Sequence, residues 1–116
     1  MRSIKTRDLA HFEYFVTENI EEGIEKADII SCATLSPTPL IFGKNLKAGQ
    51  HLDLVGAYRP DMREADDEVI LKSSVFIDTY DGMHESGDIA SPLKDGILKR
   101  EDSFSFHWEI IAPVLK

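Results

Sequence analysis

The chain has 116 residues, of which 42% are hydrophobic and 29% are charged, with 21 acidic against 13 basic side chains. This length and balance predict one soluble globular domain. The net charge of −8 argues against nucleic acid or an anionic membrane surface as the partner, because both attract basic surfaces. No apolar run approaches the ~20 residues of a membrane span. The single cysteine, Cys32, excludes an intrachain disulfide and suits a reducing compartment, so we expect a cytoplasmic protein.

The first third of the chain predicts two helices and a strand. Apolar residues within 9–16 recur at helical spacing and indicate an amphipathic helix. Asn19 followed by Glu22 forms a capping-box signal, which predicts a second helix over 20–26. The nearly unbroken apolar run over 28–34 then predicts a strand that is buried on both faces, as in a parallel sheet.

The middle of the chain predicts two more strands and a helix. The runs 51–56 and 74–79 carry closely spaced apolar residues, with β-branched Val55, Val75 and Ile77 among them, as expected for strands. Between them, Asp61 followed by Glu64 repeats the capping-box signal, so we expect a helix from Asp61 to about Lys72. In this interpretation, the acids of 64–68 form the start of that helix and its solvated face.

Helix, strand, loop, strand, helix and strand alternate along the chain, which predicts an α/β fold with a parallel sheet. Right-handed crossovers would bring all three strand ends, at Thr34, Gly56 and Thr79, to one edge of the sheet. Open α/β sheets bind their ligands at this edge, so the three strand ends form the candidate site. From composition alone, a solvated loop with local ion pairs is the simpler interpretation of the charged turn after Gly56.

Several segments, taken in order, resemble the ornithine cyclodeaminase/mu-crystallin family of nicotinamide-dependent proteins. The run from Gly56 to Glu64 reads G-A-Y-R-P-D-M-R-E and resembles the family signature G-[AS]-x-R-P-D-x-R-E. The runs 27–41, 49–55, 76–78 and 85–89 resemble further family segments in the same order. The resemblance extends from about Ile4 to Leu98, and the tail after Lys99 departs from the pattern.

The resemblance implies a partial Rossmann-like parallel sheet with flanking helices, within a single truncated NAD(P)-binding domain. Residues 1–18 would be a remnant of the first mononucleotide half, 19–98 the second half, and 99–116 a divergent tail. The sequence contains no G-x-G-x-x-[GA] run, the loop that holds the pyrophosphate at a helix N-terminus. The substrate and dimerisation domain of the family is missing as well. Since the first strand is central in a Rossmann sheet, we expect a rearranged sheet or a homo-oligomer.

The resemblance also implies cofactor contacts. Thr6 and Arg7 would meet the adenosine ribose or its 2′-phosphate, because a guanidinium forks onto phosphate oxygens. The alternative for Arg7 is an exposed N-terminal arginine. The positions that the resemblance places beside the NAD(P) cofactor are Thr34, Leu35, Val55, Gly56 and Ala57.

The same signature suggests which reaction the family branch performs. Members that cyclise ornithine carry an aspartate where this chain has Tyr58, so the resemblance favours the branch that reduces cyclic ketimines such as pyrroline- or piperideine-carboxylates. Tyr58 could donate a proton, although a tyrosine at a strand end is more often a packing residue. Arg59 and Glu85 are the candidates for the substrate pocket. The four histidines lack ligand spacing, so we expect no metal.

Two functions remain open at this point. The chain resembles part of an NAD(P)-dependent ketimine or amino acid oxidoreductase, inactive alone, whose parent enzyme acts on a small imino or amino acid. The alternative is a non-catalytic module, because mu-crystallin-like proteins also bind small ligands or serve as structural proteins. Titration with NADPH and NADH separates the two.

Overall fold

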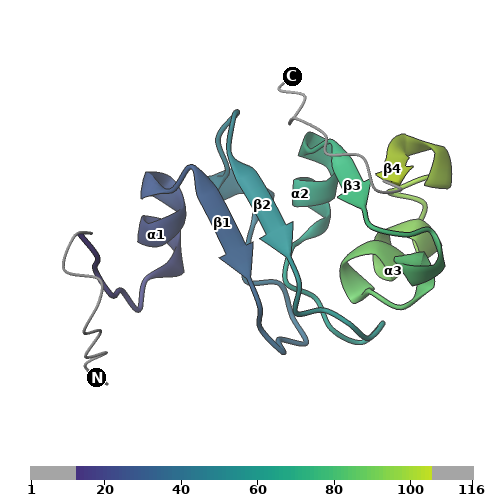
Figure 1. The fold of residues 1–116 in the computed structure, drawn as a ribbon, viewed down its shortest axis with the longest axis horizontal. Coiled ribbons are helices and arrows are strands. Elements are labelled where there is room, and N and C mark those ends of the chain that lie inside the picture. Colours follow the sequence, from purple (N-terminus) through teal and green to yellow (C-terminus); the bar gives the residue numbers. More distant parts are fainter. Residues whose placement is uncertain (1–12, 106–116) are drawn as a thin grey trace.

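The structure is a computed structural model that describes residues 13–105, with side chains over 13–102. Figure 1 shows α1 and a two-stranded sheet at one side of the molecule and a second two-stranded sheet with α2 and α3 at the other. The predictions for Thr6 and Arg7 and for the end of the tail lie outside the described residues. Within them, no helix is long and apolar enough to cross a membrane.

From residue 20 to residue 77 the helices and strands follow the order that the sequence predicts, and a further helix at Gly87–Lys94, which was not predicted, comes after them. Short 3-10 helices lie at Gly43–Asn45, Asp81–His84 and Arg100–Asp102. The helices and strands are α1 (Ile20–Lys26), β1 (Ile29–Cys32), β2 (His51–Leu54), α2 (Asp67–Lys72), β3 (Val75–Ile77), α3 (Gly87–Lys94) and β4 (Ser103–Ser105).

Helix α1 has the bounds that the sequence predicts. The side chain of Asn19 accepts a hydrogen bond from the Glu22 amide at 3.3 Å. Thr17, rather than Glu22, completes the cap, since its hydroxyl oxygen accepts from the Asn19 amide at 3.0 Å. The Glu22 carboxylate instead pairs with Lys26 at 2.7 Å. The predicted hydrogen bond from the Glu22 amide to Asn19 is therefore present, whereas the Asn19 amide donates to Thr17 in place of Glu22.

The predicted helix over 9–16 is wrong where the structure describes it. Residues 13–16 have no regular secondary structure. Tyr14, Phe15 and Val16 are all exposed, so their apolar side chains gain no burial in the described structure. Packing of an apolar face supplies most of the stability of a short helix, and this segment lacks that packing.

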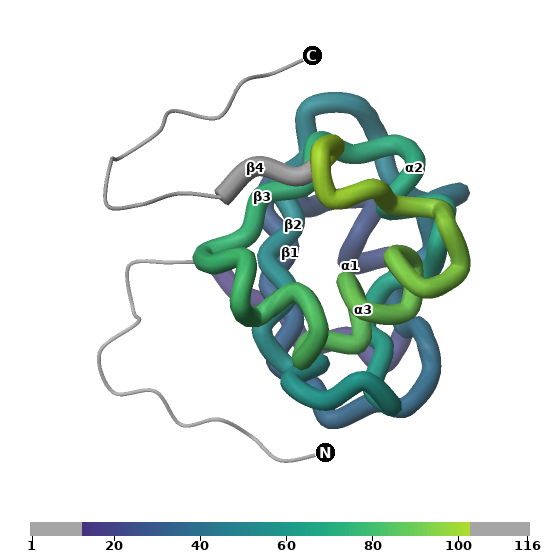
Figure 2. The backbone as a smooth tube through the Cα atoms, turned by 90° about the vertical axis from the view of Figure 1, so that its right-hand side faces the viewer, coloured from purple at the N-terminus to yellow at the C-terminus, as the bar shows by residue number. Residues whose placement is uncertain are grey.

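Strands β1 and β2 form a parallel pair, in register from Ile29 opposite His51 to Cys32 opposite Leu54. One face of this pair packs into the main core. The prediction that β1 is buried on both faces is wrong, because Ile29 is 71% exposed and Ser31 is exposed as well. Figure 2 shows that β1, β2 and β3 lie along one side of the molecule, whereas α2 and α3 lie on the other, so the helices leave one face of β1 uncovered. The core residues are Ile24, Cys32, Ile41, Ala65 and Val69, packed against Ile30, Leu46, Leu52 and Leu54.

Strand β3 does not join the first sheet. It pairs in parallel with β4, with Phe76 opposite Phe104. Val75 of β3 packs with Ile70 and Leu98 in a second apolar cluster. The α/β class with parallel pairing is therefore confirmed, but the single three-stranded edge is wrong. Thr79 follows a strand of the other sheet, so only the ends of β1 and β2 are neighbours by strand pairing.

The predicted start of the third helix is also wrong. Helix α2 begins at Asp67, and its N-cap is Asp66, whose side chain accepts from the Val69 amide at 3.0 Å. Asp61 is exposed and pairs with Arg59 at 2.7 Å. Glu64 is fully buried rather than part of a solvated helix face. The capping pattern at Asp61 is therefore coincidental, and the connection stays irregular up to residue 66.

Candidate functional site

The carboxylate of Glu64 joins the ends of β1 and β2. Its Oε1 atom accepts hydrogen bonds from the Thr34 amide at 2.5 Å and from the Thr34 hydroxyl at 2.8 Å. Its Oε2 atom accepts from the Gly56 amide at 2.8 Å. Burying a charge is costly unless it is paired or hydrogen-bonded, and bonds to an ionised acceptor are the strong ones. One buried side chain thus fixes both strand ends relative to each other.

Gly56 is required by this close approach. A Cβ atom at residue 56 would overlap the backbone nitrogen and oxygen of Thr34 and the Oε1 atom of Glu64. The φ angle is not in the left-handed region, so the constraint is space rather than backbone conformation. A glycine is needed wherever backbone must approach backbone this closely.

The N-terminus of α3 contacts the connection that follows Gly56. The amide of Gly87 donates to the carbonyl of Ala57 at 3.1 Å. A Cβ at residue 87 would overlap the Met62 carbonyl oxygen and lie 2.7 Å from the Arg59 carbonyl oxygen. The second required glycine therefore lets α3 contact the connection that carries the family signature.

Asp88 is a buried residue of this site that the sequence did not reveal. Its Oδ1 atom accepts from the amides of Glu64 and Ala65 at 2.9 and 3.0 Å, and Arg63 Nε lies 3.7 Å from the same atom. Its Oδ2 atom has no hydrogen-bond partner among the described residues. Burial raises the pKa of the Asp88 carboxyl, against the opposing effect of the two amides and of Arg63. Its place in the run 85–89 was the available signal, but nothing in that run distinguishes a buried acid from a helix-start acid.

The structure brings together most of the predicted cofactor positions. Thr34 and Gly56 share the Glu64 carboxylate, and Ala57 is buried at 3% exposure. Leu35 and Val55, the neighbours of the two bonded residues, are 69% and 61% exposed. The edge therefore presents two exposed apolar side chains above a buried polar clamp, defined here as the three hydrogen bonds to Glu64.

The predicted substrate and catalytic candidates lie on the rim. Tyr58 is 60% exposed, and Glu85 is exposed between the 3-10 helix Asp81–His84 and α3. Arg59 donates from Nε and Nη2 to the two oxygens of Asp61 at 2.9 and 2.7 Å. This pairing holds the pKa of the Asp61 carboxyl below its usual value. The solvated-loop interpretation is therefore correct for Arg59 and Asp61, and incorrect for Glu64.

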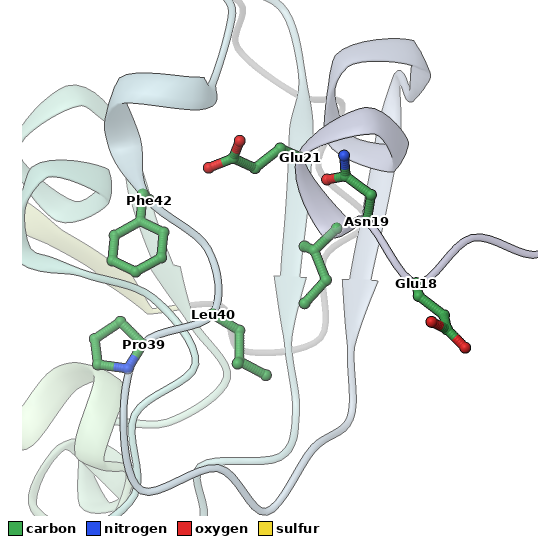
Figure 3. Close-up of a pocket in the computed structure, with 7 residues that line it drawn as sticks. Glu18, Asn19, Glu21, Pro39, Leu40 and Phe42 are labelled. Carbon is green, nitrogen blue, oxygen red and sulfur yellow. The ribbon is translucent and has the colours of Figure 1, made fainter.

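An open hollow of about 530 Å³ lies elsewhere, between the start of α1 and the connection before residue 43. Figure 3 shows Pro39, Leu40 and Phe42 on this connection, with Asn19 and Glu21 across from them. None of the predicted site residues lines it. Across residues 13–105, no three His, Cys, Asp or Glu side chains are grouped to hold a metal ion.

Parallel strand pairs connected by helices place the chain among Rossmann-like α/β folds, as its solved relatives do. A solved relative is similar in structure: Δ1-pyrroline-2-carboxylate reductase from Thermococcus litoralis, determined in complex with NADH and L-proline. It has a TM-score of 0.72 and 34% identity, over 77% of this chain and 28% of that one. The chain belongs to the ornithine cyclodeaminase/mu-crystallin family, whose sequence pattern matches residues 2–116.

Curated relatives agree with this assignment. Protein SAR DEFICIENT 4 of Arabidopsis thaliana is 46% identical over 85 residues, which cover 73% of this chain and 26% of that protein. Ketimine reductase mu-crystallin of Mus musculus is 34% identical over 98 residues, which cover 84% of this chain and 29% of that protein. The chain thus spans between a quarter and a third of the length of these relatives. The family match includes the stretch after Lys99.

Proposed function

We propose that this chain forms the nicotinamide side of the NAD(P) site in a reductase of cyclic ketimines or related amino acids. The observation that carries the proposal is the clamp of Glu64 on the ends of two adjacent parallel strands. Ligands of open α/β folds bind outside these carboxyl ends. The relatives support the substrate class, because one was solved with NADH and L-proline and another is named a ketimine reductase.

The side chains at this edge suit a nicotinamide ring. Leu35 and Val55 are apolar and more than half exposed, so a planar ring packed on them would remove apolar surface from water. Tyr58 lies next along the chain, and its exposed side chain is available to contact a substrate or donate a proton. Arg59 and Glu85, also exposed, are the proposed carboxylate- and amine-facing residues of the substrate pocket.

We do not expect this chain alone to catalyse hydride transfer. Hydride transfer needs a held pyrophosphate and a bound substrate carboxylate besides the nicotinamide edge. This sequence supplies the edge and spans 26–29% of the length of the cited relatives. We therefore propose weak cofactor binding without turnover. We also propose a cytoplasmic location, which suits the free, buried thiol of Cys32.

Self-association is the remaining part of the proposal. The bare face of β1 and β2 carries Ile29 at 71% exposure, whereas parallel sheets are normally covered on both faces. Light scattering at increasing concentration tests this: Ile29→Asp should reduce the apparent mass, and Leu71→Asp, at a similarly exposed α2 position, should not. A wild-type monomer at all concentrations would remove self-association from the proposal.

Titration of the 116-residue chain with NADH and NADPH, followed by nicotinamide fluorescence, tests the cofactor role. Leu35→Asp should abolish binding, and Leu71→Asp serves as the matched control, because the two leucines are 69% and 68% exposed. Dissociation constants weaker than about 1 mM for both cofactors would end the cofactor proposal. Binding of a cyclic imino acid without either cofactor would favour the alternative, a non-catalytic small-ligand module of the mu-crystallin kind.

A further inference from the structure

The hydrogen bonds to Glu64 connect this buried carboxylate to the residues beside the two exposed apolar side chains of the edge. The amides that bond to Glu64 belong to Thr34 and Gly56. The next residue after Thr34 is Leu35, and the residue before Gly56 is Val55, the two exposed apolar side chains of the edge. The Val55 amide donates to the Cys32 carbonyl at 2.9 Å, which holds Val55 against β1. The Glu64 carboxylate bonds to the two following amides and so controls the spacing of Leu35 and Val55 beyond that last backbone bond.

The backbone of Glu64 is itself held from two sides. Its carbonyl accepts from the amides of Leu40 and Ile41, each at 2.9 Å. Its amide donates to Asp88 Oδ1 at 2.9 Å. Ile41 belongs to the main core and Asp88 lies in the first turn of α3, so these bonds hold the Glu64 backbone against both. A shift of the clamp would require several buried hydrogen bonds to lengthen together.

We infer that Glu64 is a positioning residue for the nicotinamide ring, acting through the spacing of Leu35 and Val55. The inference rests on the proposed function. Both carboxylate oxygens of Glu64 accept hydrogen bonds from backbone amides. A glutamine side chain at residue 64 would place its NH2 group, a donor, against one of these N–H groups. Glu64→Gln therefore keeps size and burial but separates one strand end from the other.

The test compares binding of reduced nicotinamide mononucleotide to three forms of the full chain. Glu64→Gln should weaken binding about tenfold relative to the wild type, the scale of a lost buried hydrogen bond. Glu68→Gln is the matched control and should leave the affinity unchanged, because the Glu68 carboxylate is partly exposed on α2 and pairs with the half-exposed Lys72. Amide hydrogen exchange at Gly56 should speed up in Glu64→Gln and stay the same in Glu68→Gln.

A variant that only destabilises the fold separates positioning from general stability. Leu98→Ala removes a buried side chain of the second cluster. Circular dichroism gives the folded fraction of this variant, and the affinity of that fraction should equal the wild-type value. If Glu64→Gln does not fold, Thr34→Val replaces it. This variant removes the hydroxyl that donates to Glu64 and accepts from the Ser36 amide at 3.3 Å. It should weaken binding about threefold, whereas Thr34→Ser keeps the hydroxyl and should bind like the wild type.

The outcomes separate the two claims. Unchanged affinity in folded Glu64→Gln, or an equal loss in Leu98→Ala, would overturn the positioning role and leave the proposed function standing. A wild-type chain that does not bind the mononucleotide would overturn both.

Discussion

The Oδ1 atom of Asp88 lies 2.9 Å from the amide nitrogen of Glu64, so one buried carboxylate holds the backbone of another. Both residues are almost fully inaccessible, at 2% and 0% exposure. The two acids are not paired with each other. Glu64 receives three hydrogen bonds on its carboxylate, whereas Asp88 receives two on one oxygen and leaves Oδ2 without a partner among the described residues. Asp88 is therefore the less completely hydrogen-bonded of the two buried carboxyl groups.

Stability should depend on pH through Asp88. Burial raises its folded pKa above the ordinary 3.8, so the folded state holds the proton more tightly than the unfolded chain. This contribution is complete below the unfolded pKa and is lost as pH rises through the folded pKa. Asp88→Asn keeps an acceptor for the two amides and removes the titration. Urea unfolding between about pH 3 and pH 7 should show the wild type losing stability relative to Asp88→Asn as pH rises.

The variant difference isolates this residue, because every other carboxyl group is common to both proteins. Parallel pH profiles for the two proteins would contradict the assignment. A wild type that gains stability relative to Asp88→Asn with rising pH would also contradict it, since Arg63, 3.7 Å away, would then dominate over burial.

Gly56→Ala should destabilise the fold strongly. The added methyl would overlap the Thr34 backbone and Glu64 Oε1, and the clamp would have to open to accommodate it. We expect a loss of about 3 kcal/mol in the free energy of unfolding, at the upper end for overpacking. Gly82→Ala is the control, since its Cβ would meet Thr79 at an ordinary 3.6 Å and should change stability by under about 1 kcal/mol. Equal effects of the two variants in urea unfolding would show that the close approach at Gly56 is not maintained in solution.

The sequence predicted the fold class because its signals are local and redundant. Helix α1 follows from Asn19 and a short apolar face, and both β1 and β2 follow from apolar runs. The alternation of Phe104, Phe106 and Trp108 is typical of a strand, and β4 lies at its start. The pairing of β4 with β3 could not be predicted, because alternation does not say which strand is the partner. Strand partners depend on long-range contacts that local periodicity does not contain.

The sequence predicted that the ends of β1 and β2 lie together, but it misjudged the burial of Glu64. The strand-end rule placed Thr34 and Gly56 together, and the structure confirms that they are neighbours. Asp61 and Glu64 have the spacing of a capping box, but the same spacing arises when one acid stays in solvent and the other turns inward. Burial of an acid depends on donors from elsewhere in the chain, so spacing alone could not identify Glu64 or Asp88 as buried.

The location of the α2 cap can be tested by a pair of aspartates. Asp66 Oδ1 accepts from the amides of Val69 at 3.0 Å and Gly43 at 2.9 Å, so Asp66→Ala should cost about 1–2 kcal/mol of stability. Asp61→Ala should cost much less, because its pair with Arg59 is exposed and screened by solvent. Urea unfolding of both variants decides the matter. A larger cost for Asp61→Ala would restore the helix start predicted from the sequence.

The Cys32 thiol should be unreactive in the folded protein. It is 8% exposed, and burial, with smaller effects of the nearby Glu64, Asp88 and Asp53 carboxylates, raises its pKa to about 11. The thiolate is the reactive form, so at neutral pH the native protein should react with Ellman's reagent far more slowly than a free thiol. Reaction in increasing urea should accelerate together with unfolding and reach one thiol per chain. Fast labelling without denaturant would show that β1 opens locally, and comparison with Glu64→Gln would then report whether the clamp controls that opening.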